Sequence, residues 1–425
     1  MQALEEAAIE NPERVAGLEP WQQVLFFLAA CAILVTRRWD ALSHAQFYAE
    51  DGRVFFADAY NRGWFSPMFS PYAGYLHLFT RIGAALALLL PFSRVPLFFS
   101  IGSLLCTALP VAILMNSRSA DWGSARFRAA LAALYIALPN CRETTWGLTN
   151  TFSILALSAF LVLIARVPKG GWALALDSIL LIVSGLNGPF CLFMVPIALY
   201  LLWKERNRIR AIQASILVFA ATVQAVFLLF IDAHVRSHTS LGASPVMLLR
   251  LTGGHVFLGA EIGSNTLASV NDPAIVGFLA VVSIAGLALI IQGFRLESRS
   301  FRLLLIYALM IIAASLAAPL QLGTSKAGVW QVLATVPGQR YWFLPTLVFV
   351  WSLAALILHG RGLSRGLSCV LLALLPVGVA RDWEIPKLYE SHFAQSVEQF
   401  NAAAPGTVLT LPEGCPGWTM RIVKH

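Results

Sequence analysis

Two adjacent acidic side chains, Glu50 and Asp51, stand among aromatic residues shortly after the first apolar stretch of the chain. Carboxylates held near a membrane surface between aromatic rings are partly desolvated. Desolvation raises the pKa of a carboxyl group and suits it to act as a general base. A second interpretation is structural, because acidic residues favour helix N-termini and a helix is expected to begin near Val54. The residues alone leave both interpretations open.

Other polar side chains that could contact a substrate lie in the segments between apolar runs. Arg142 and Glu143 follow a break at Pro139, and Asn187 opens a tight turn. A neighbouring Arg-Glu pair in a short loop is commonly structural, and Asn187 is a candidate to hydrogen-bond a sugar. These three residues are therefore candidate substrate contacts with a structural alternative.

Histidines and cysteines give no metal-binding pattern. His234, His238 and His255 lack a carboxylate at a supporting spacing, and the six cysteines form no CxxC or Cys/His motif. We therefore expect no metal site, and we expect the segment 232–272 to line an acceptor groove, with His255 as a candidate contact. Two cysteines lie in polar segments expected on one side, Cys141 and Cys415, and a disulfide between them is left open.

These side chains are carried by a very apolar chain. Of its 425 residues, 58% are hydrophobic and 12% are charged, whereas a soluble domain carries about 25% charged residues. Apolar runs of about 18 residues or more, such as 211–231 and 303–320, can cross the hydrocarbon core of a bilayer. The composition predicts an all-α polytopic membrane protein and excludes a soluble domain. The net charge of +8 is then a matter of membrane orientation, and no nucleic-acid partner is expected.

Twelve apolar runs lie between charged links, and we expect about 11 transmembrane helices plus one interfacial or re-entrant helix. The runs cover residues 21–36, 73–91, 97–115, 129–139, 151–165, 172–186, 189–203, 211–231, 273–293, 303–320, 341–359 and 367–380. The segment before the first run is acidic, unlike the basic start of a signal peptide, so we expect that run to be a retained span.

Lysine and arginine gather in short links between these runs. The links carry Arg118, Arg126 and Arg128; Arg166 and Lys169; Lys204, Arg206, Arg208 and Arg210; Arg295, Arg299 and Arg302; and Arg361 and Arg365. Two runs separate each link from the next, so all of them face one side, which the positive-inside rule makes cytoplasmic. The outer side then collects 140–150, 187–188, 232–272, 321–340 and 381–425.

The side of the first loop, residues 37–72, depends on the run that follows it. If 73–91 crosses the membrane, the loop is cytoplasmic, and Arg37 and Arg38 favour that choice. If 73–91 is interfacial or re-entrant, the loop lies outside. The aromatic and basic residues near the start of this run favour the second choice, because such side chains stay at the level of the lipid headgroups.

A short first span, an acidic pair in the next loop and an amphipathic stretch with a Pro-Tyr element resemble the GT-C membrane glycosyltransferases. The resemblance implies a polyprenyl-phosphate-linked sugar as donor and an acid of the first outer loop as the base that activates the acceptor. Glu50 and Asp51 take that place, and Asp58 is a second acid. The juxtamembrane element supplies further candidate contacts, Tyr72, Tyr75, His77 and Arg81. A sizeable soluble C-terminal domain, present in larger members, is missing from this sequence.

A lipid phosphate needs cationic partners at headgroup depth, and the arginine fork can bind phosphate oxygens bidentately. Arg340, beside Tyr341 and Trp342 at the start of an apolar run, is the main candidate. Lys326 in the same link and Arg81 are further candidates. The alternative for Arg340 is an interfacial anchor, a role that membrane helices often give to arginine and aromatic residues.

The sequence therefore predicts an inverting glycosyltransferase in the cytoplasmic membrane of a bacterium, with its active site facing outward and no cofactor. Its partners would be membrane lipid, the lipid-linked donor and a glycan, lipid or protein acceptor. We expect a cytoplasmic tail (1–20), a transmembrane region (21–380) with an outer loop (37–96), and a short extracytoplasmic cap (381–425). The alternatives are a transporter or flippase of lipid-linked glycans, or a polysaccharide polymerase or ligase.

Overall fold

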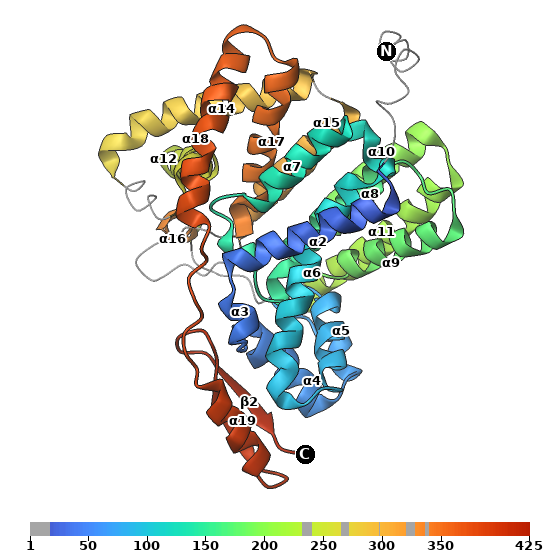
Figure 1. The fold of residues 1–425 in the computed structure, drawn as a ribbon, viewed down its shortest axis with the longest axis vertical. Coiled ribbons are helices and arrows are strands. Elements are labelled where there is room, and N and C mark those ends of the chain that lie inside the picture. Colours follow the sequence, from blue (N-terminus) through green and yellow to red (C-terminus); the bar gives the residue numbers. More distant parts are fainter. Residues whose placement is uncertain (1–17, 232–239, 265–271, 297, 320–327, 336–339) are drawn as a thin grey trace.

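A computed structural model describes residues 18–231, 240–264, 272–296, 298–319, 328–335 and 340–425. Within these ranges the protein is a bundle of helices with one two-stranded sheet near the C-terminus (Figure 1). The expected all-α polytopic class is confirmed.

Seven helices of the described ranges are long and apolar enough to cross a membrane. They are α2 (Pro20–Arg37), α6 (Val95–Met115), α11 (Arg208–Val226), α14 (Val276–Leu296), α15 (Arg299–Ala317), α17 (Phe343–His359) and α18 (Gly362–Asp382). Each coincides with one of the expected runs, because a continuous apolar stretch of this length is stable in lipid only as a helix.

Five other apolar runs form shorter helices. They are α5 (Leu78–Ala87), α7 (Ala125–Ile136), α8 (Phe152–Ile164), α9 (Gly171–Gly185) and α10 (Cys191–Glu205). At about 1.5 Å per residue, even the longest of these falls short of a hydrocarbon core about 30 Å thick. The expected number of about 11 spans therefore stays a prediction. Helix α5 is too short to cross, as expected of an interfacial or re-entrant helix.

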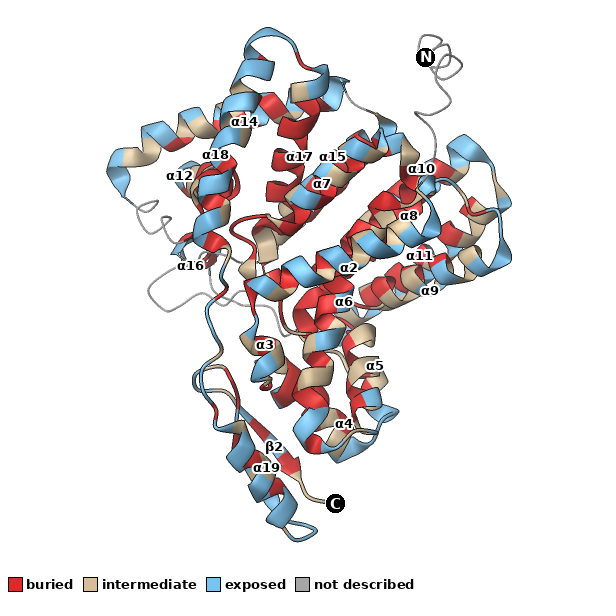
Figure 2. Ribbon diagram, in the orientation of Figure 1, coloured by how far each residue is buried: buried red, intermediate tan, exposed pale blue. Residues whose placement is uncertain are grey.

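Two helices form the centre of the bundle. Every residue of α8 is buried, and α17 is buried along nearly its whole length. A helix that is apolar on all sides can be surrounded by protein or by lipid, and these two helices are surrounded by protein. Helices α2, α11, α14 and α18 are mostly exposed and form the outer layer, which would face lipid (Figure 2).

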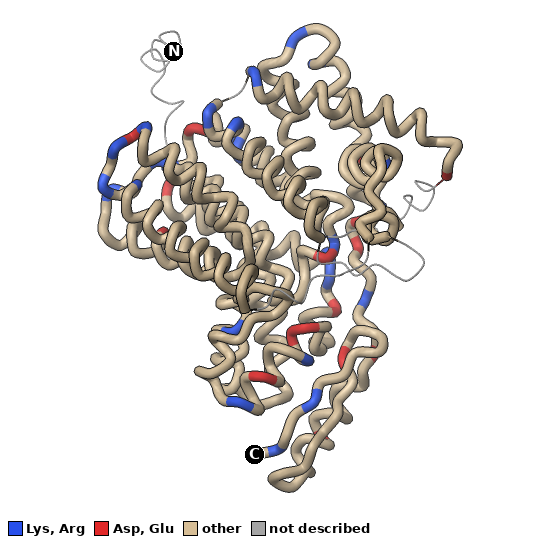
Figure 3. The backbone as a smooth tube through the Cα atoms, turned by 180° about the vertical axis from the view of Figure 1, so that it is seen from behind, with Lys and Arg blue, Asp and Glu red and all other residues tan. Residues whose placement is uncertain are grey.

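The basic links lie where the positive-inside pattern predicts a common side. In Figure 3 several of them gather at the end of the bundle away from the C-terminus. Arg118 also donates two hydrogen bonds to Asp177 of α9, at 2.9 and 2.5 Å, so the acid inside that apolar run has a local partner. This pairing gives Asp177 a structural role.

Short elements connect the longer helices. They are α3 (Asp40–Ser43), η2 (Asp51–Phe56), α4 (Ala57–Arg62), η3 (Ser66–Phe69), η4 (Phe92–Arg94), η5 (Ser117–Trp122), η6 (Arg142–Thr144), η7 (Thr149–Thr151), η8 (Phe227–Ile231), α12 (Pro245–Leu249), η10 (Arg250–Leu258), α13 (Gly259–Ile262), η12 (Pro273–Ile275), α16 (Val329–Thr335) and η13 (Arg340–Trp342). The segment Pro245–Ile262, which lies within the expected acceptor-groove segment 232–272, is thus one nearly continuous helical stretch.

The C-terminal segment is a regular subdomain, although its prolines and glycines suggested an irregular cap. It contains α19 (Phe393–Ala402) and the antiparallel strands β1 (Val408–Pro412) and β2 (Thr419–Val423), with the dense Gly-Pro stretch forming the turn between them. The Gly414 amide donates to the Phe47 carbonyl at 2.8 Å, and the Ser391 amide donates to the Gln46 side chain at 2.7 Å. The cap is therefore attached to the first loop. Cys141 and Cys415 are free thiols.

Candidate functional site

The carboxylate of Asp51, a residue of η2, is buried against the N-terminal end of α8, one of the two central helices. Its oxygens accept hydrogen bonds from the Leu148 and Thr149 amides, both at 2.8 Å, and from the Thr149 hydroxyl at 2.5 Å. The first amides of a helix lack partners within the helix and favour a negative charge. Burial raises the pKa of Asp51 to about 6, although the donors from Thr149 and Leu148 partly offset this effect. Asp51 therefore caps the helical turn η7 that leads into α8.

Glu50 has a different environment from its neighbour. Its side chain is partly exposed, and the Tyr72 hydroxyl donates to Oε1 at 3.3 Å. Burial and the Glu50 carboxylate together raise the pKa of Tyr72 to about 12, so the phenol keeps its proton and remains a donor. Of the two acids, Glu50 is the one that a substrate can reach.

Arg340 is held in place by Glu143. The Arg340 amide donates to Glu143 Oε2 at 2.8 Å, and Nη1 donates to Oε1 at 2.5 Å. The guanidinium also lies over the Phe152 and Tyr341 rings, at 5.8 and 5.5 Å from the centroids. Because a guanidinium has five N–H donors, the bond to Glu143 orients Arg340 and leaves further donors for an anion.

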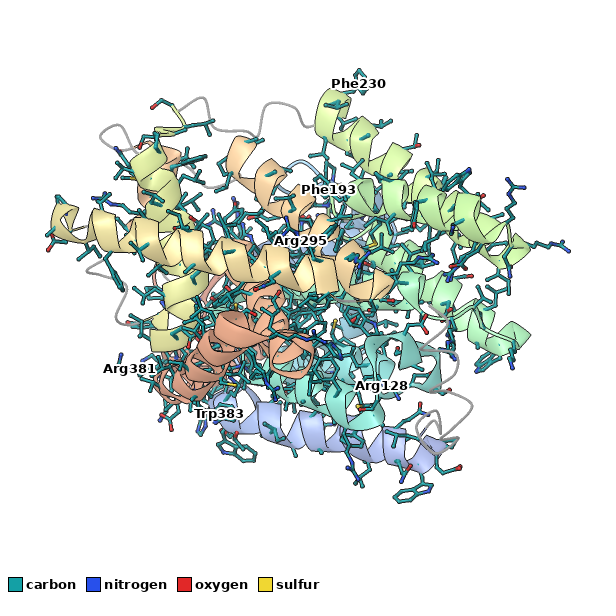
Figure 4. All side chains as sticks on the ribbon, turned by 90° about the horizontal axis from the view of Figure 1, so that it is seen from above. Arg128, Phe193, Phe230, Arg295, Arg381 and Trp383 are labelled. Atoms are coloured by element: carbon teal, nitrogen blue, oxygen red, sulfur yellow. The ribbon has the colours of Figure 1, made fainter. Side chains whose placement is uncertain are left out.

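Arg340 lines an apolar cavity of about 350 Å³. Helices α8, α10, α15 and α17 form much of its wall, and Tyr75 and Tyr341 also line it. The remaining lining residues are mostly apolar: Phe152, Ser153, Pro189, Phe190, Leu192, Phe193, Leu228, Ile311, Ala314, Ser315, Ala317, Ala318, Phe343 and Leu344. Figure 4 labels Phe193 from this wall and Phe230, which is exposed at the end of η8 near the lining residue Leu228. The cavity can take an apolar chain attached to an anionic group.

Glu50 and Arg340 lie close enough to interact electrostatically. Tyr72 and Tyr75 each interact electrostatically with both Arg340 and Glu50. The first loop and the start of α17 therefore contribute to one site, although about two thirds of the sequence separates them.

His77 is buried next to this site and is surrounded by aromatic rings. Its ring centroid is 4.8 Å from Tyr75, 5.3 Å from Phe55 and 5.8 Å from Tyr72. Burial lowers the pKa of His77 to about 3, and the charges of Arg81 and Arg340 act in the same direction. The imidazole is neutral at pH 7 and packs the inner wall of the site.

Asp58 and Arg81 are paired with each other. Arg81 is buried, donates to Asp58 at 2.6 Å and to the Ser70 carbonyl at 3.2 Å, and lies over the Phe55 ring. A buried arginine with these partners has little capacity left for a lipid phosphate. The pair therefore stabilises the first loop, which disfavours the expectation of Asp58 as a second acid and Arg81 as a phosphate ligand.

The other candidates are distributed around the site. Asn187 is buried and accepts from the Phe79 amide at 3.1 Å, which ties the turn to α5. His255 is buried against Trp342 and bonded to the Ala334 carbonyl at 3.0 Å, so it belongs to the core. Arg142 is half-buried in the turn η6 beside Glu143. Lys326 lies outside the described residues.

One residue near the site was not among the candidates. Glu413 of the cap is 1% exposed and lies against Gly52, next to the acidic pair. Burial raises the pKa of Glu413 to about 8, and the charge of Asp51 adds to the effect. Its only signal in the sequence is an acid within a Pro-Gly turn, which does not reveal what it contacts.

No group of three or more His, Cys, Asp or Glu side chains in the described ranges could hold a metal ion. The expectation of transfer without metal or cofactor stays a prediction.

No family model and no curated protein matches the chain. Among solved structures, the chain is similar to the arabinofuranosyltransferase AftD from Mycobacteria, with 16% sequence identity over 87% of this chain and a TM-score of 0.42. It covers 27% of the length of that protein. AftD is by its name a glycosyltransferase, the class that the first loop of this chain resembles. At this identity and TM-score, the activity of the chain has to be inferred from its own side chains.

Proposed function

We propose that the protein is a membrane glycosyltransferase that moves a sugar from a polyprenyl-phosphate donor to an acceptor hydroxyl. The observation that carries the proposal is Arg340, which lines an apolar cavity, is bonded to Glu143 and interacts electrostatically with Glu50. A carboxylate can serve as the base, a fixed guanidinium can bind a lipid phosphate, and an apolar cavity can hold a prenyl chain.

The donor would lie with its phosphate at Arg340 and the first part of its prenyl chain in the cavity. The cavity supplies apolar contact for the chain, and the interaction of Arg340 with the phosphate strengthens as negative charge develops on the leaving group. Glu143 fixes the guanidinium beforehand, so little reorganisation is needed during the reaction.

Glu50 would act as the general base. Its carboxylate takes the proton of the acceptor hydroxyl while the hydroxyl oxygen forms a bond to the anomeric carbon. The bond from that carbon to the phosphate oxygen breaks, and polyprenyl phosphate leaves with the electron pair. A single displacement of this kind inverts the anomeric configuration. Asp51, which accepts three hydrogen bonds from residues 148 and 149, would position the loop that carries Glu50.

The face of the membrane is also part of the proposal. By the positive-inside rule the basic links would face the cytoplasm, so the site would face outward in the cytoplasmic membrane of a bacterium. The donor would be drawn from the outer leaflet, and the acceptor would be an envelope glycan, lipid or protein.

A transporter of lipid-linked glycans is the second candidate, because a lipid-phosphate site beside an apolar cavity also suits a flippase. The two are distinguished in liposomes that contain the purified protein, a fluorescent polyprenyl-phosphate sugar and an envelope acceptor fraction. The transferase releases polyprenyl phosphate and labels the acceptor. Movement of intact donor between leaflets without release of polyprenyl phosphate would replace the proposal with the transporter.

A polymerase or ligase would instead depend on the helical stretch Pro245–Ile262. Substitutions of Arg250 and His255 would then reduce transfer as strongly as a substitution of Glu50. We expect a smaller effect, since His255 makes its contacts with Ala334 and Trp342 inside the bundle.

A further inference from the structure

The buried carboxyl group of Glu413 has an unusual position, because it comes from the C-terminal cap and lies beside the two acids of the first loop. A methyl group placed on Gly52 would be 2.5 Å from Glu413 Oε1 and 2.8 Å from Phe47 Cβ, so a larger residue at position 52 would displace the Glu413 carboxyl. The side chain is 1% exposed. Glu413 therefore fills a space built for it next to Asp51.

Neither oxygen of Glu413 makes a hydrogen bond of ordinary geometry in the structure. The nearest backbone donor is the Arg53 amide, which already donates to the Ala49 carbonyl at 3.3 Å. The Arg53 side chain is exposed and lies over the Trp418 ring, 5.1 Å from its centroid. Glu413 thus lacks the donors that stabilise Asp51.

The charged groups that face Glu413 are mostly acidic. Asp51 and Glu50 approach from the first loop, Cys415 lies on the cap itself, and Arg53 is the basic group among them. An ionised Glu413 would add a negative charge to Asp51 and Glu50 in a desolvated place. A neutral Glu413 fits the same place without that repulsion.

We propose that Glu413 is a positioning residue of the transferase site. Its neutral carboxyl holds the C-terminal cap on the first loop, and ionisation of this carboxyl loosens the cap. The loop so held includes Phe47, whose carbonyl receives the Gly414 amide, and Glu50 three residues further on. Seating of the cap fixes the loop that carries the base. The effect on cap seating stands by itself, and the effect on sugar transfer rests on the function proposed above.

The sign of the pH dependence follows from the raised pKa. Released into water, the Glu413 carboxyl would titrate near the ordinary value of about 4.3, whereas in the seated cap its pKa is about 8. Between these values the seated form binds one proton more than the released form. Seating therefore weakens as pH rises through this window, by at most about tenfold per pH unit, and is constant above it.

The test is hydrogen exchange of the Gly414 and Ser391 amides, which donate to the Phe47 carbonyl and to the Gln46 side chain in the seated cap. Exchange is followed from about pH 5 to about pH 9 in the full-length protein, after correction for the intrinsic pH dependence of exchange. We expect protection in the wild type to fall up to about pH 8 and then to level off, and protection in Glu413→Gln, which imitates the neutral acid, to lack the fall between about pH 6 and about pH 8. Glu398→Gln, an exposed acid of the same cap, is the matched control and should follow the wild type.

A flat profile of the wild type would overturn the proposal without the use of any variant. Parallel profiles of the wild type and Glu413→Gln would overturn it as well. The same samples are assayed for sugar transfer, and the ratio of the Glu413→Gln rate to the wild-type rate should increase with pH. If exchange behaves as expected and no variant transfers sugar, the cap inference stands and the proposed function fails.

Discussion

Asp51 and Thr149 are joined by two hydrogen bonds that end on the same carboxylate oxygen, one from the Thr149 amide at 2.8 Å and one from its hydroxyl at 2.5 Å. They connect the first loop to the start of α8, which also carries Phe152 beside Arg340. Through this link the first loop is attached to the helix that carries Phe152, which lies beside Arg340.

Replacement of Asp51 should therefore act on stability. In Asp51→Asn an amide nitrogen replaces one of the two carboxylate oxygens, and each of these oxygens accepts from a backbone amide, so at least one buried donor loses its acceptor. We expect a loss of about 2 kcal/mol in the free energy of unfolding, the usual cost of such a loss. Thermal unfolding of the detergent-solubilised protein, followed by exposure of its buried cysteines, measures the change. An unchanged free energy of unfolding in Asp51→Asn would show that the hydrogen bonds from Leu148 and Thr149 to Asp51 contribute nothing to stability.

Arg340 and Glu143 should act on the lipid donor as a unit. Arg340→Lys keeps the charge but loses the planar fork, and Glu143→Gln loosens the guanidinium, so both should weaken use of the donor. We expect kcat/KM for the donor to fall by about 100-fold in Arg340→Lys, similar to the loss of one transition-state donor, and less in Glu143→Gln. The double variant should be no worse than the more damaging single variant, because the residues share one role. Additive losses would indicate separate functions.

The apolar cavity can be blocked from helix α15. A large side chain in Ala314→Trp would fill space that the prenyl chain needs, so the KM for a long-chain donor should rise more than that for a short-chain analogue. Leu309→Trp on the same helix is the matched control, because Leu309 is 66% exposed. Equal effects of Ala314→Trp on both donors would place the chain elsewhere.

The first loop should be reachable from outside the cell. A single cysteine at Ser66, which is exposed, is introduced into a background from which the six cysteines have been removed. A membrane-impermeant thiol reagent should label it in intact cells, whereas a cysteine at Lys169, in a basic link, should react only after lysis. The reverse pattern would place the site in the cytoplasm, apart from the acceptors proposed for it.

The class of the fold was predictable because lipid imposes it. Long apolar runs such as 273–293 and 303–320 must become helices, whatever they pack against. The four runs between 129 and 203 were harder to interpret, since in α8 burial by protein replaces burial by lipid and a shorter helix is sufficient.

The site was predictable only in part. Sequence reasoning identified Glu50, Asp51 and Arg340 as candidates, but it could not separate the two acids, since their difference lies in contacts with residues 148 and 149. The pairing of Arg340 with Glu143 crosses 197 positions, and Glu413 reaches Gly52 from the far end of the chain. Such contacts depend on tertiary packing, and no local pattern records them.

Glu50→Gln measures the central claim most directly. The substitution keeps the size of the side chain and an acceptor for the Tyr72 hydroxyl but removes the base. Transfer from a labelled polyprenyl-phosphate sugar is compared in liposomes that contain the wild type, Glu50→Gln or the control Glu398→Gln. We predict that Glu50→Gln lowers the rate of transfer by about 10²- to 10⁴-fold, the range for loss of a general base, while the control keeps the wild-type rate. A Glu50→Gln protein that transfers sugar at the wild-type rate would contradict the role of Glu50 as the base and the mechanism proposed here.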